Sequence, residues 1–127
     1  MAGELILIVD DNPLNLKMVG FLLTSKGYKV ATASNAKEAL TSLTTSEPHL
    51  ILMDIQLPGM DGLELTRLVK SDAKYQHIPI IAITAFAMKG DKEKTLAAGC
   101  DGYIAKPIDV RTLPDIISDY LHAHKEG

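Results

Sequence analysis

The sequence predicts an α/β fold, a doubly wound sandwich in which helices cover both faces of a five-stranded parallel sheet. Two observations carry this prediction. Five short apolar runs alternate with longer stretches that have helical signals, and most of these runs are continuously apolar. Continuous runs are typical of parallel strands buried on both faces, and strand–helix alternation is typical of sheets with crossover helices.

The predicted strands are short segments, most of them rich in isoleucine, leucine and valine. They are Leu5–Asp10, Lys29–Ala33, Leu50–Asp54, Ile78–Thr84 and Gly102–Ala105. Since crossovers between parallel strands are right-handed, five such strand–helix units favour a (βα)5 sandwich. Its expected strand order is the flavodoxin-like 2-1-3-4-5.

The first predicted helix follows the first strand directly. Asn12 is a suitable N-cap, Pro13 fits the first helical position, and Gly27 is a suitable terminator. Two apolar stripes run along this helix, one formed by Leu16, Val19 and Leu23 and the other by Leu14, Met18 and Phe21. A helix on a sheet buries one side fully. The second stripe is therefore either part of the core or an exposed surface for a partner helix, and the sequence leaves both alternatives open.

The later helices carry signals of the same kind. Asn35 with Glu38, and Asp61 with Glu64, have the spacing of capping boxes. Lys89–Ala98 is expected to be helical and to close at the following glycine.

The last helix has a less obvious start. A proline is harmless in the first turn of a helix but disturbs its interior. Thr112 as N-cap places Pro114 in that first turn, so the helix is expected to begin near residue 113.

Composition sets limits on the class of protein. The chain has 127 residues, 46% of them hydrophobic, with a net charge of −3 and one cysteine. These values predict one soluble globular domain and disfavour a disordered or nucleic-acid-binding chain. No apolar run approaches the roughly 18 residues that span a bilayer, and the basic flank of a signal peptide is absent. We expect a cytoplasmic protein with no membrane partner.

Charged and polar residues stand where the predicted strands end. They are Asp10, Asp11, Asp54, Thr84 and Lys106. Ligands of open parallel sheets bind at the carboxyl ends of the strands, so these side chains should converge. Two like charges about 4 Å apart cost about 4 kcal/mol at an effective dielectric near 20. Three carboxylates with one lysine therefore indicate a site for Mg²⁺ and a phosphoryl group.

Four segments carry a resemblance to a known family. They are Ile8–Asn12, Leu52–Gly62, Ile83–Ala85 and Tyr103–Pro107, all in the expected order and spacing. Over essentially its whole length, the chain resembles the CheY-like receiver domain of response regulators. The segment Ala85–Asp91 looks like that of small stand-alone regulators of the DivK type. The resemblance implies that residues 1–127 form a single receiver domain with no output domain, although a receiver from a larger hybrid kinase would look the same.

The resemblance also implies a role for each acid. Asp54 would accept a phosphoryl group from a phosphohistidine of a sensor histidine kinase or histidine phosphotransfer protein. Asp11, Asp54 and the backbone carbonyl of Gln56 would bind Mg²⁺, and Asp10 would act through a metal-bound water.

Three further residues would stabilise or report the phosphorylated state. Lys106 would pair with Asp54 and then with the phosphoryl oxygens. Thr84 would hydrogen-bond the phosphoryl group, and Tyr103 would be the switch residue that turns inward as Thr84 moves. Lys106–Pro107 would be a cis peptide, and an apolar Phe86 would slow hydrolysis and lengthen the phosphorylated state.

The implied function is that of a phosphorelay response regulator that signals through contacts with a downstream protein target. Two other functions are less compatible with the sequence. A Mg²⁺-dependent phosphatase of the haloacid dehalogenase type needs an acid two residues after the nucleophile, where Gln56 stands. A flavin or nucleotide carrier would need a glycine-rich loop after the first strand, where Asp10 and Asp11 stand. We therefore expect a phosphoacceptor, not an enzyme.

Overall fold

A computed structural model describes residues 3–57, 59–84 and 89–126, with residues 89–92 and 123–126 described by their backbone alone. The elements alternate along the chain as β1 (Leu5–Val9), α1 (Pro13–Ser25), β2 (Lys29–Ala33), α2 (Ala36–Thr45), β3 (Leu50–Asp54), α3 (Gly62–Ser71), β4 (Ile80–Thr84), α4 (Lys89–Ala98), β5 (Gly102–Ala105) and α5 (Leu113–Glu126).

The strands form one parallel sheet with the order β2-β1-β3-β4-β5, which confirms the predicted topology. In the register, Val9 of β1 lies opposite Met53 of β3, and Asp54 lies opposite Ile83 of β4. Thr84 at the end of β4 lies opposite Ala105 of β5. The ends of β1, β3, β4 and β5 therefore meet at one edge of the sheet.

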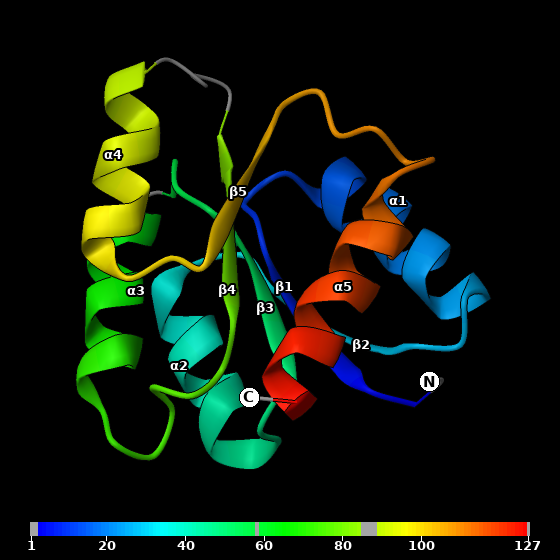
Figure 1. The fold of residues 1–127 in the computed structure, drawn as a ribbon, viewed down its shortest axis with the longest axis horizontal. Coiled ribbons are helices and arrows are strands. Elements are labelled where there is room, and N and C mark those ends of the chain that lie inside the picture. The colour runs from blue at the N-terminus through cyan, green and yellow to red at the C-terminus, as the bar shows by residue number, and fades with distance from the viewer. Residues whose placement is uncertain (1–2, 58, 85–88, 127) are drawn as a thin grey trace.

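Helices cover both faces of the sheet (Figure 1). Alternate residues of the central strands contribute to two separate apolar clusters. One cluster joins the sheet to α1 and α5, through residues such as Val19, Leu23 and Ile117. The other joins it to α2 and α3, through residues such as Leu43 and Leu65. All five residues of β3 and of β4 are buried, as expected for strands covered on both faces.

Most predicted boundaries agree with the structure, and two strands are shorter than predicted. The first strand ends at Val9 and not at Asp10, and the fourth begins at Ile80 and not at Ile78. Ile78 donates its N–H to the carbonyl of Tyr75 in a turn, at 3.0 Å. Pro79 has no N–H to give to a neighbouring strand, so pairing starts one residue later.

The predicted helix caps are present, with differences in detail. Asn35 accepts the N–H of Glu38, but the Glu38 carboxylate accepts the N–H and hydroxyl of Ser34, one residue before the expected partner. Asp61 accepts the N–H of Glu64. The last helix begins after Thr112 as predicted, although the Thr112 hydroxyl donates to the carbonyl of Asp109 at 3.3 Å.

The structure decides between the two apolar stripes of α1. Val19 and Leu23 are buried, and Leu16 packs partly against the same cluster. Leu14, Met18 and Phe21 are exposed by 76%, 44% and 79%. The second stripe is therefore an exposed apolar surface and not a second part of the core. Among the described residues, no helix is both long enough and apolar enough to cross a bilayer.

Candidate phosphoacceptor site

Three carboxylates converge where β1 and β3 end. Each of Asp10, Asp11 and Asp54 can offer one oxygen such that all three oxygens lie within 4.8 Å of one another. Asp10 and Asp54 are each 1% exposed, whereas Asp11 is exposed. The predicted convergence of acids at this edge is therefore present.

Asp54 is held by donors on both carboxylate oxygens. Its Oδ1 accepts the backbone N–H of Gln56 at 2.9 Å, and its Oδ2 lies 3.1 Å from Nζ of Lys106. Burial nevertheless raises the pKa of Asp54, with a contribution from the charge of Asp10, against the lowering by Gln56 and Lys106. Since one lysine does not fully compensate the buried charge, the site favours a further cation.

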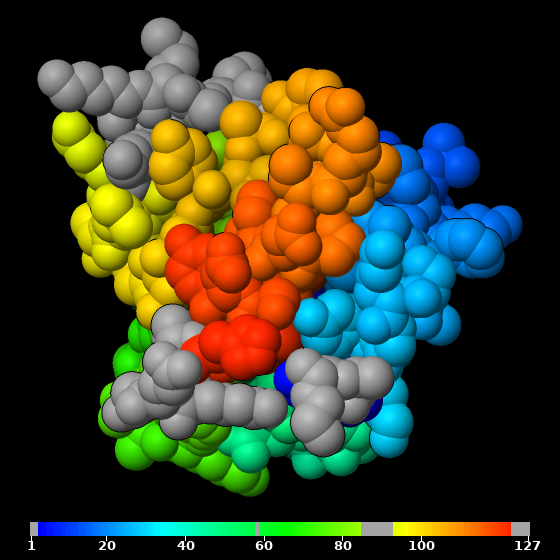
Figure 2. Space-filling view, turned by 45° about the vertical axis from the view of Figure 1, so that its right-hand side comes forward, coloured from blue at the N-terminus to red at the C-terminus, as the bar shows by residue number. Residues whose placement is uncertain are grey.

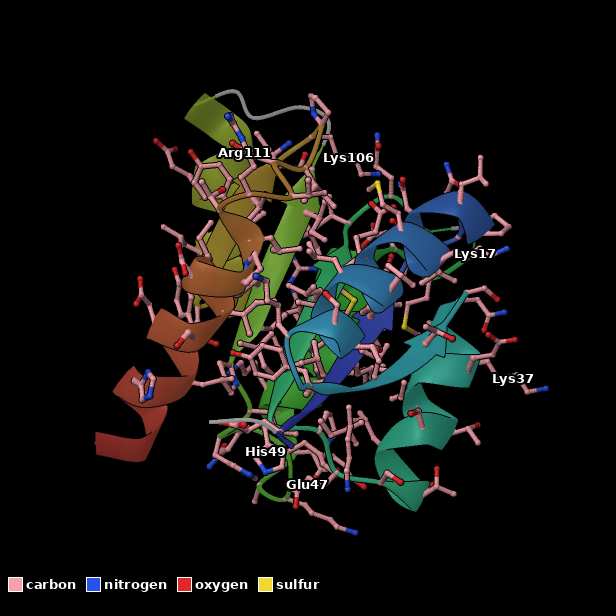
Figure 3. The ribbon with its side chains drawn as sticks, turned by 90° about the vertical axis from the view of Figure 1, so that its right-hand side faces the viewer. Lys17, Lys37, Glu47, His49, Lys106 and Arg111 are labelled. Atoms are coloured by element: carbon pink, nitrogen blue, oxygen red, sulfur yellow. The ribbon has the colours of Figure 1, made fainter. Side chains whose placement is uncertain are left out.

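Lys106 reaches Asp54 from the loop after β5. Its backbone N–H donates to the carbonyl of Thr84 at 2.8 Å, and its peptide bond to Pro107 is cis, as predicted. Figure 3 shows Lys106 at the end of the molecule where α1 begins, far from Glu47 and His49 at the opposite end. The lysine is 23% exposed, so its ammonium group stands between the buried acid and solvent.

The two residues expected to report the state of the site lie on the neighbouring strands β4 and β5, two positions apart in the register. Thr84 is fully buried at the end of β4. Tyr103 pairs with Ala82 in the register and packs, partly buried, against the cluster that contains Leu65 of α3. The switch roles of Thr84 and Tyr103 stay a prediction.

Gly62 permits the close approach of α3 to the end of β3. A Cβ at this position would contact the backbone oxygen of Asp54 and would lie 2.6 Å from Cα of Ile55. The N–H of Gly62 also donates to the carbonyl of Ile55 at 3.1 Å. The sequence gave no sign of this contact, which depends on the tertiary approach of α3.

Asn15 is a second contributor that sequence reasoning missed. Its side-chain amide donates to Oδ2 of Asp10 at 3.3 Å. An asparagine in the first turn of a predicted helix, five residues after an acid at a strand end, was the available signal. That signal is weak because asparagine near a helix start most often serves the helix itself.

Two other residues lie away from the acids. Cys100 is buried, and its thiol lies 3.7 Å from Oγ1 of Thr66. His122 is exposed, with a ring nitrogen 3.3 Å from the Ser118 hydroxyl. Phe86 and the segment 85–88 lie outside the described residues, so the prediction that Phe86 slows hydrolysis stays a prediction.

The donor set fits a hard divalent cation. Carboxylate and carbonyl oxygens are the protein ligands that Mg²⁺ prefers, usually one or two carboxylates with several waters. The three acids meet this requirement, and the exposure of Asp11 gives a path for a hydrated ion. The more specific ligand set of Asp11, Asp54 and the Gln56 carbonyl stays a prediction.

Comparisons with known proteins agree with this geometry. A sequence model of the response regulator receiver domain matches residues 6–118. The polar-differentiation response regulator DivK of Brucella anthropi is 47% identical over 116 residues, which cover 91% of this chain and 94% of that protein.

Solved structures agree as well. A CheY-like receiver domain protein from Methanospirillum hungatei is 34% identical with a TM-score of 0.90, covering 99% of this chain and 100% of that one. The receiver domain of a sensor histidine kinase from Pseudomonas aeruginosa is 37% identical with a TM-score of 0.87, covering 95% and 99%; its structure has a magnesium ion coordinated in the active-site cleft.

Fold, acidic site and comparisons together define a receiver domain of two-component signalling. The chain belongs to the response regulator receiver domain family. Of the proteins named above, DivK of Brucella anthropi has the highest sequence identity to this chain, at 47%.

Proposed function

We propose that Asp54 accepts a phosphoryl group from a phosphohistidine, supplied by a sensor histidine kinase or a histidine phosphotransfer protein. The environment of Asp54 is the main support for this proposal. Its Oδ2 lies 3.1 Å from Nζ of Lys106, and one oxygen of Asp54 lies within 4.8 Å of an oxygen of each of Asp10 and Asp11. We further propose that residues 1–127 act as a single receiver domain in the cytoplasm and signal through contacts with a downstream protein, without binding nucleic acid.

The reaction that we propose is a transfer from nitrogen to oxygen. An oxygen of Asp54 forms a bond to phosphorus while the phosphorus–nitrogen bond of the donor breaks, and the imidazole nitrogen keeps the electron pair. The product is an acyl phosphate, a covalent intermediate of the aspartyl-phosphate kind. Bound Mg²⁺ would supply positive charge for the phosphoryl oxygens, with Asp10 reaching it through a water. Lys106, whose Nζ lies 3.1 Å from Oδ2 of Asp54, would then pair with the negatively charged phosphoryl oxygens.

The phosphorylated state needs a reporter, and Thr84 and Tyr103 are suited to that task. Thr84 ends the strand next to Asp54, and the carbonyl of Thr84 binds the N–H of Lys106. A hydroxyl that turns toward the new phosphoryl group would leave space for the Tyr103 ring, which is only partly buried here. We propose that this coupled change alters the surface near β5.

The chemistry that we propose is confined to the protein's own carboxylate. Gln56 cannot donate or accept a proton as a catalytic acid, and it stands two residues after Asp54. We therefore expect self-directed phosphotransfer and slow autodephosphorylation, without turnover of an external substrate.

Small-molecule phosphorylation tests the proposal. The protein is incubated with Mg²⁺ and a small phosphodonor such as phosphoramidate, and the intact mass is measured. We expect the wild type to gain one phosphoryl group, Asp54→Asn to gain none, and Lys106→Met to be slowed or blocked. Labelling that survives in Asp54→Asn, or steady turnover of an external phosphomonoester, would overturn the assignment.

The phosphodonor protein needs a docking surface, and we propose that the exposed stripe of Leu14, Met18 and Phe21 provides it. Figure 2 shows α1 and α5 side by side on one face of the molecule. Met18 also lines a surface pocket of about 480 Å³ with Lys106 and Pro107, so the stripe leads toward the lysine that contacts Asp54.

Substitution of Phe21 tests the docking surface. Phe21 is 79% exposed, so Phe21→Ala should leave the fold intact. It should slow phosphotransfer from a histidine phosphotransfer protein by about tenfold, since loss of a central apolar anchor costs about 1–2 kcal/mol. Phosphorylation by phosphoramidate should be unchanged. Slowing by the same factor with both donors would contradict the proposed surface, and so would an unchanged rate with the phosphotransfer protein.

A further inference from the structure

Asp10 is almost fully buried beside two other acids. A buried carboxylate needs hydrogen-bond donors, because its desolvation is otherwise unfavourable. Two donors reach it from the start of α1. The N–H of Asn12 donates to Oδ1 at 2.9 Å, and the amide of Asn15 donates to Oδ2 at 3.3 Å.

Asn15 is itself fixed by the helix cap. The Asn12 side chain accepts the backbone N–H of Leu14 at 2.9 Å and that of Asn15 at 3.4 Å. The cap of α1 and the carboxylate of Asp10 therefore form one hydrogen-bond network. The start of the helix therefore sets the direction of the Asn15 amide. Asn12 donates its N–H to Oδ1 of Asp10, and the Asn15 amide donates to the other oxygen, Oδ2.

We propose that Asn15 is a positioning residue for the metal site, which it serves by fixing the direction of the Asp10 carboxylate. This inference rests on the proposed function, because it takes the three acids to be the Mg²⁺ site. With the Asn15 bond in place, each Asp10 oxygen has one protein donor. Each oxygen also keeps a lone pair for a metal-bound water.

Loss of the Asn15 amide would leave the Asp10 carboxylate with the hydrogen bond from Asn12 to Oδ1 and remove the one to Oδ2. The terminal torsion of an aspartate has a broad, soft energy profile, so its second oxygen would then sample several directions. Mg²⁺ demands near-octahedral geometry, and groups that orient metal ligands typically change metal affinity by about 10–100-fold. The effect should therefore appear in Mg²⁺ affinity more than in the stability of the fold.

The surroundings of Asn15 make it suitable for substitution. The residue is partly buried and lines the surface pocket together with Met18 and Lys106. Alanine and leucine are better helix formers than asparagine. Asn15→Ala and Asn15→Leu should therefore fold as well as the wild type, and Thr24→Ala, at an exposed position of the same helix, serves as the control.

Mg²⁺ titration by isothermal calorimetry tests the inference on the unphosphorylated protein. We expect the Kd for Mg²⁺ to rise about tenfold or more in both Asn15 variants and to stay within about twofold in Thr24→Ala. The thermal midpoint in EDTA should not fall in any of the three. A Kd within about twofold of the wild type in both Asn15 variants would overturn the inference.

Phosphorylation by phosphoramidate at increasing Mg²⁺ gives a second readout. In the Asn15 variants the half-saturating Mg²⁺ concentration should rise by the same factor as the Kd, while the rate at saturating Mg²⁺ stays close to that of the wild type. A slowed rate at saturation with an unchanged Kd would overturn the positioning role. Persistent labelling of Asp54→Asn would instead overturn the proposed function, and the calorimetric Kd values would still decide the role of Asn15.

Discussion

Gly62 determines how closely the start of α3 can approach the phosphoacceptor. A methyl group at this position would meet the backbone of Asp54 and Ile55 at less than contact distance. The backbone cannot yield as a flexible side chain does, so the end of β3 would have to shift. The absence of a side chain at Gly62 therefore helps to set the position of Asp54.

Gly62→Ala should therefore lower both stability and phosphorylation. Overpacking against backbone typically costs about 1–3 kcal/mol, and the shifted Asp54 should be phosphorylated more slowly by phosphoramidate. Gly20→Ala is the matched control, because its Cβ would lie 3.6 Å from a Val30 methyl, an ordinary contact within a helix. Urea unfolding and a phosphorylation time course measure both effects. Equal behaviour of the two variants would contradict the steric role of Gly62.

Glu38 contributes stability that depends on pH. The N–H and hydroxyl of Ser34 hold the pKa of Glu38 below its ordinary value of 4.5. A group with a lowered pKa stabilises the fold above its ordinary pKa, and this contribution is lost as the pH falls through the folded pKa. Glu38→Gln keeps an acceptor oxygen and removes the charge.

We expect Glu38→Gln to be less stable than the wild type at neutral pH and to approach it below about pH 4. Urea unfolding midpoints across this range measure the difference. A difference that is constant with pH, or that grows toward acid, would show that the charge of Glu38 does not act through this cap.

At the scale of elements, Lys70 connects three segments at the edge of the sheet opposite the acids. Its ammonium group donates to the carbonyls of Ile78 and Gln76 at 2.7 and 3.2 Å and contacts Asp101 at 3.0 Å. The same Asp101 oxygen accepts the N–H of Ile80 at 2.8 Å. The end of α3 is thereby tied to the starts of β4 and β5.

Lys70→Met should destabilise the fold by about 1–3 kcal/mol, because it removes donors from partly buried acceptors. Phosphorylation of Asp54 should be unchanged, since the network lies at the other edge of the sheet. The exposed Lys17 of α1 gives the control Lys17→Met, with an expected change within about 0.5 kcal/mol. Denaturant unfolding checks both values. A loss of phosphorylation in Lys70→Met without loss of stability would contradict this separation.

Element order and sheet topology followed from the sequence because continuous apolar runs and cap residues are local signals. The convergence of Asp10, Asp54 and Lys106 followed because parallel strands end at one edge. The exposed side of α1 did not follow, since both stripes are equally apolar and only the docking of the helix on the sheet distinguishes them. Asn15 and Gly62 depend in the same way on contacts between segments that the sequence does not specify.

At the scale of the whole molecule, Mg²⁺ should stabilise the folded protein. A ligand of the native state alone adds about 2.7 kcal/mol at a concentration 100-fold above its Kd. The thermal midpoint should therefore rise by several degrees in Mg²⁺ and return in EDTA, as calorimetric scanning would measure. Asp11→Asn should reduce the rise, and Asp119→Asn, at an exposed position of α5, should retain it. An unchanged midpoint in the wild type at saturating Mg²⁺ would contradict binding at the acids.

Chemical trapping tests the central claim most directly. Borohydride reduces an aspartyl phosphate to homoserine, which peptide mass spectrometry locates in the chain. After incubation with Mg²⁺ and phosphoramidate, we predict homoserine at position 54 and, in the sample without donor, aspartate at the same position. Homoserine at another acid, or a stable phosphoryl group on a histidine with Asp54 unmodified, would contradict the assignment of Asp54 as the phosphoacceptor.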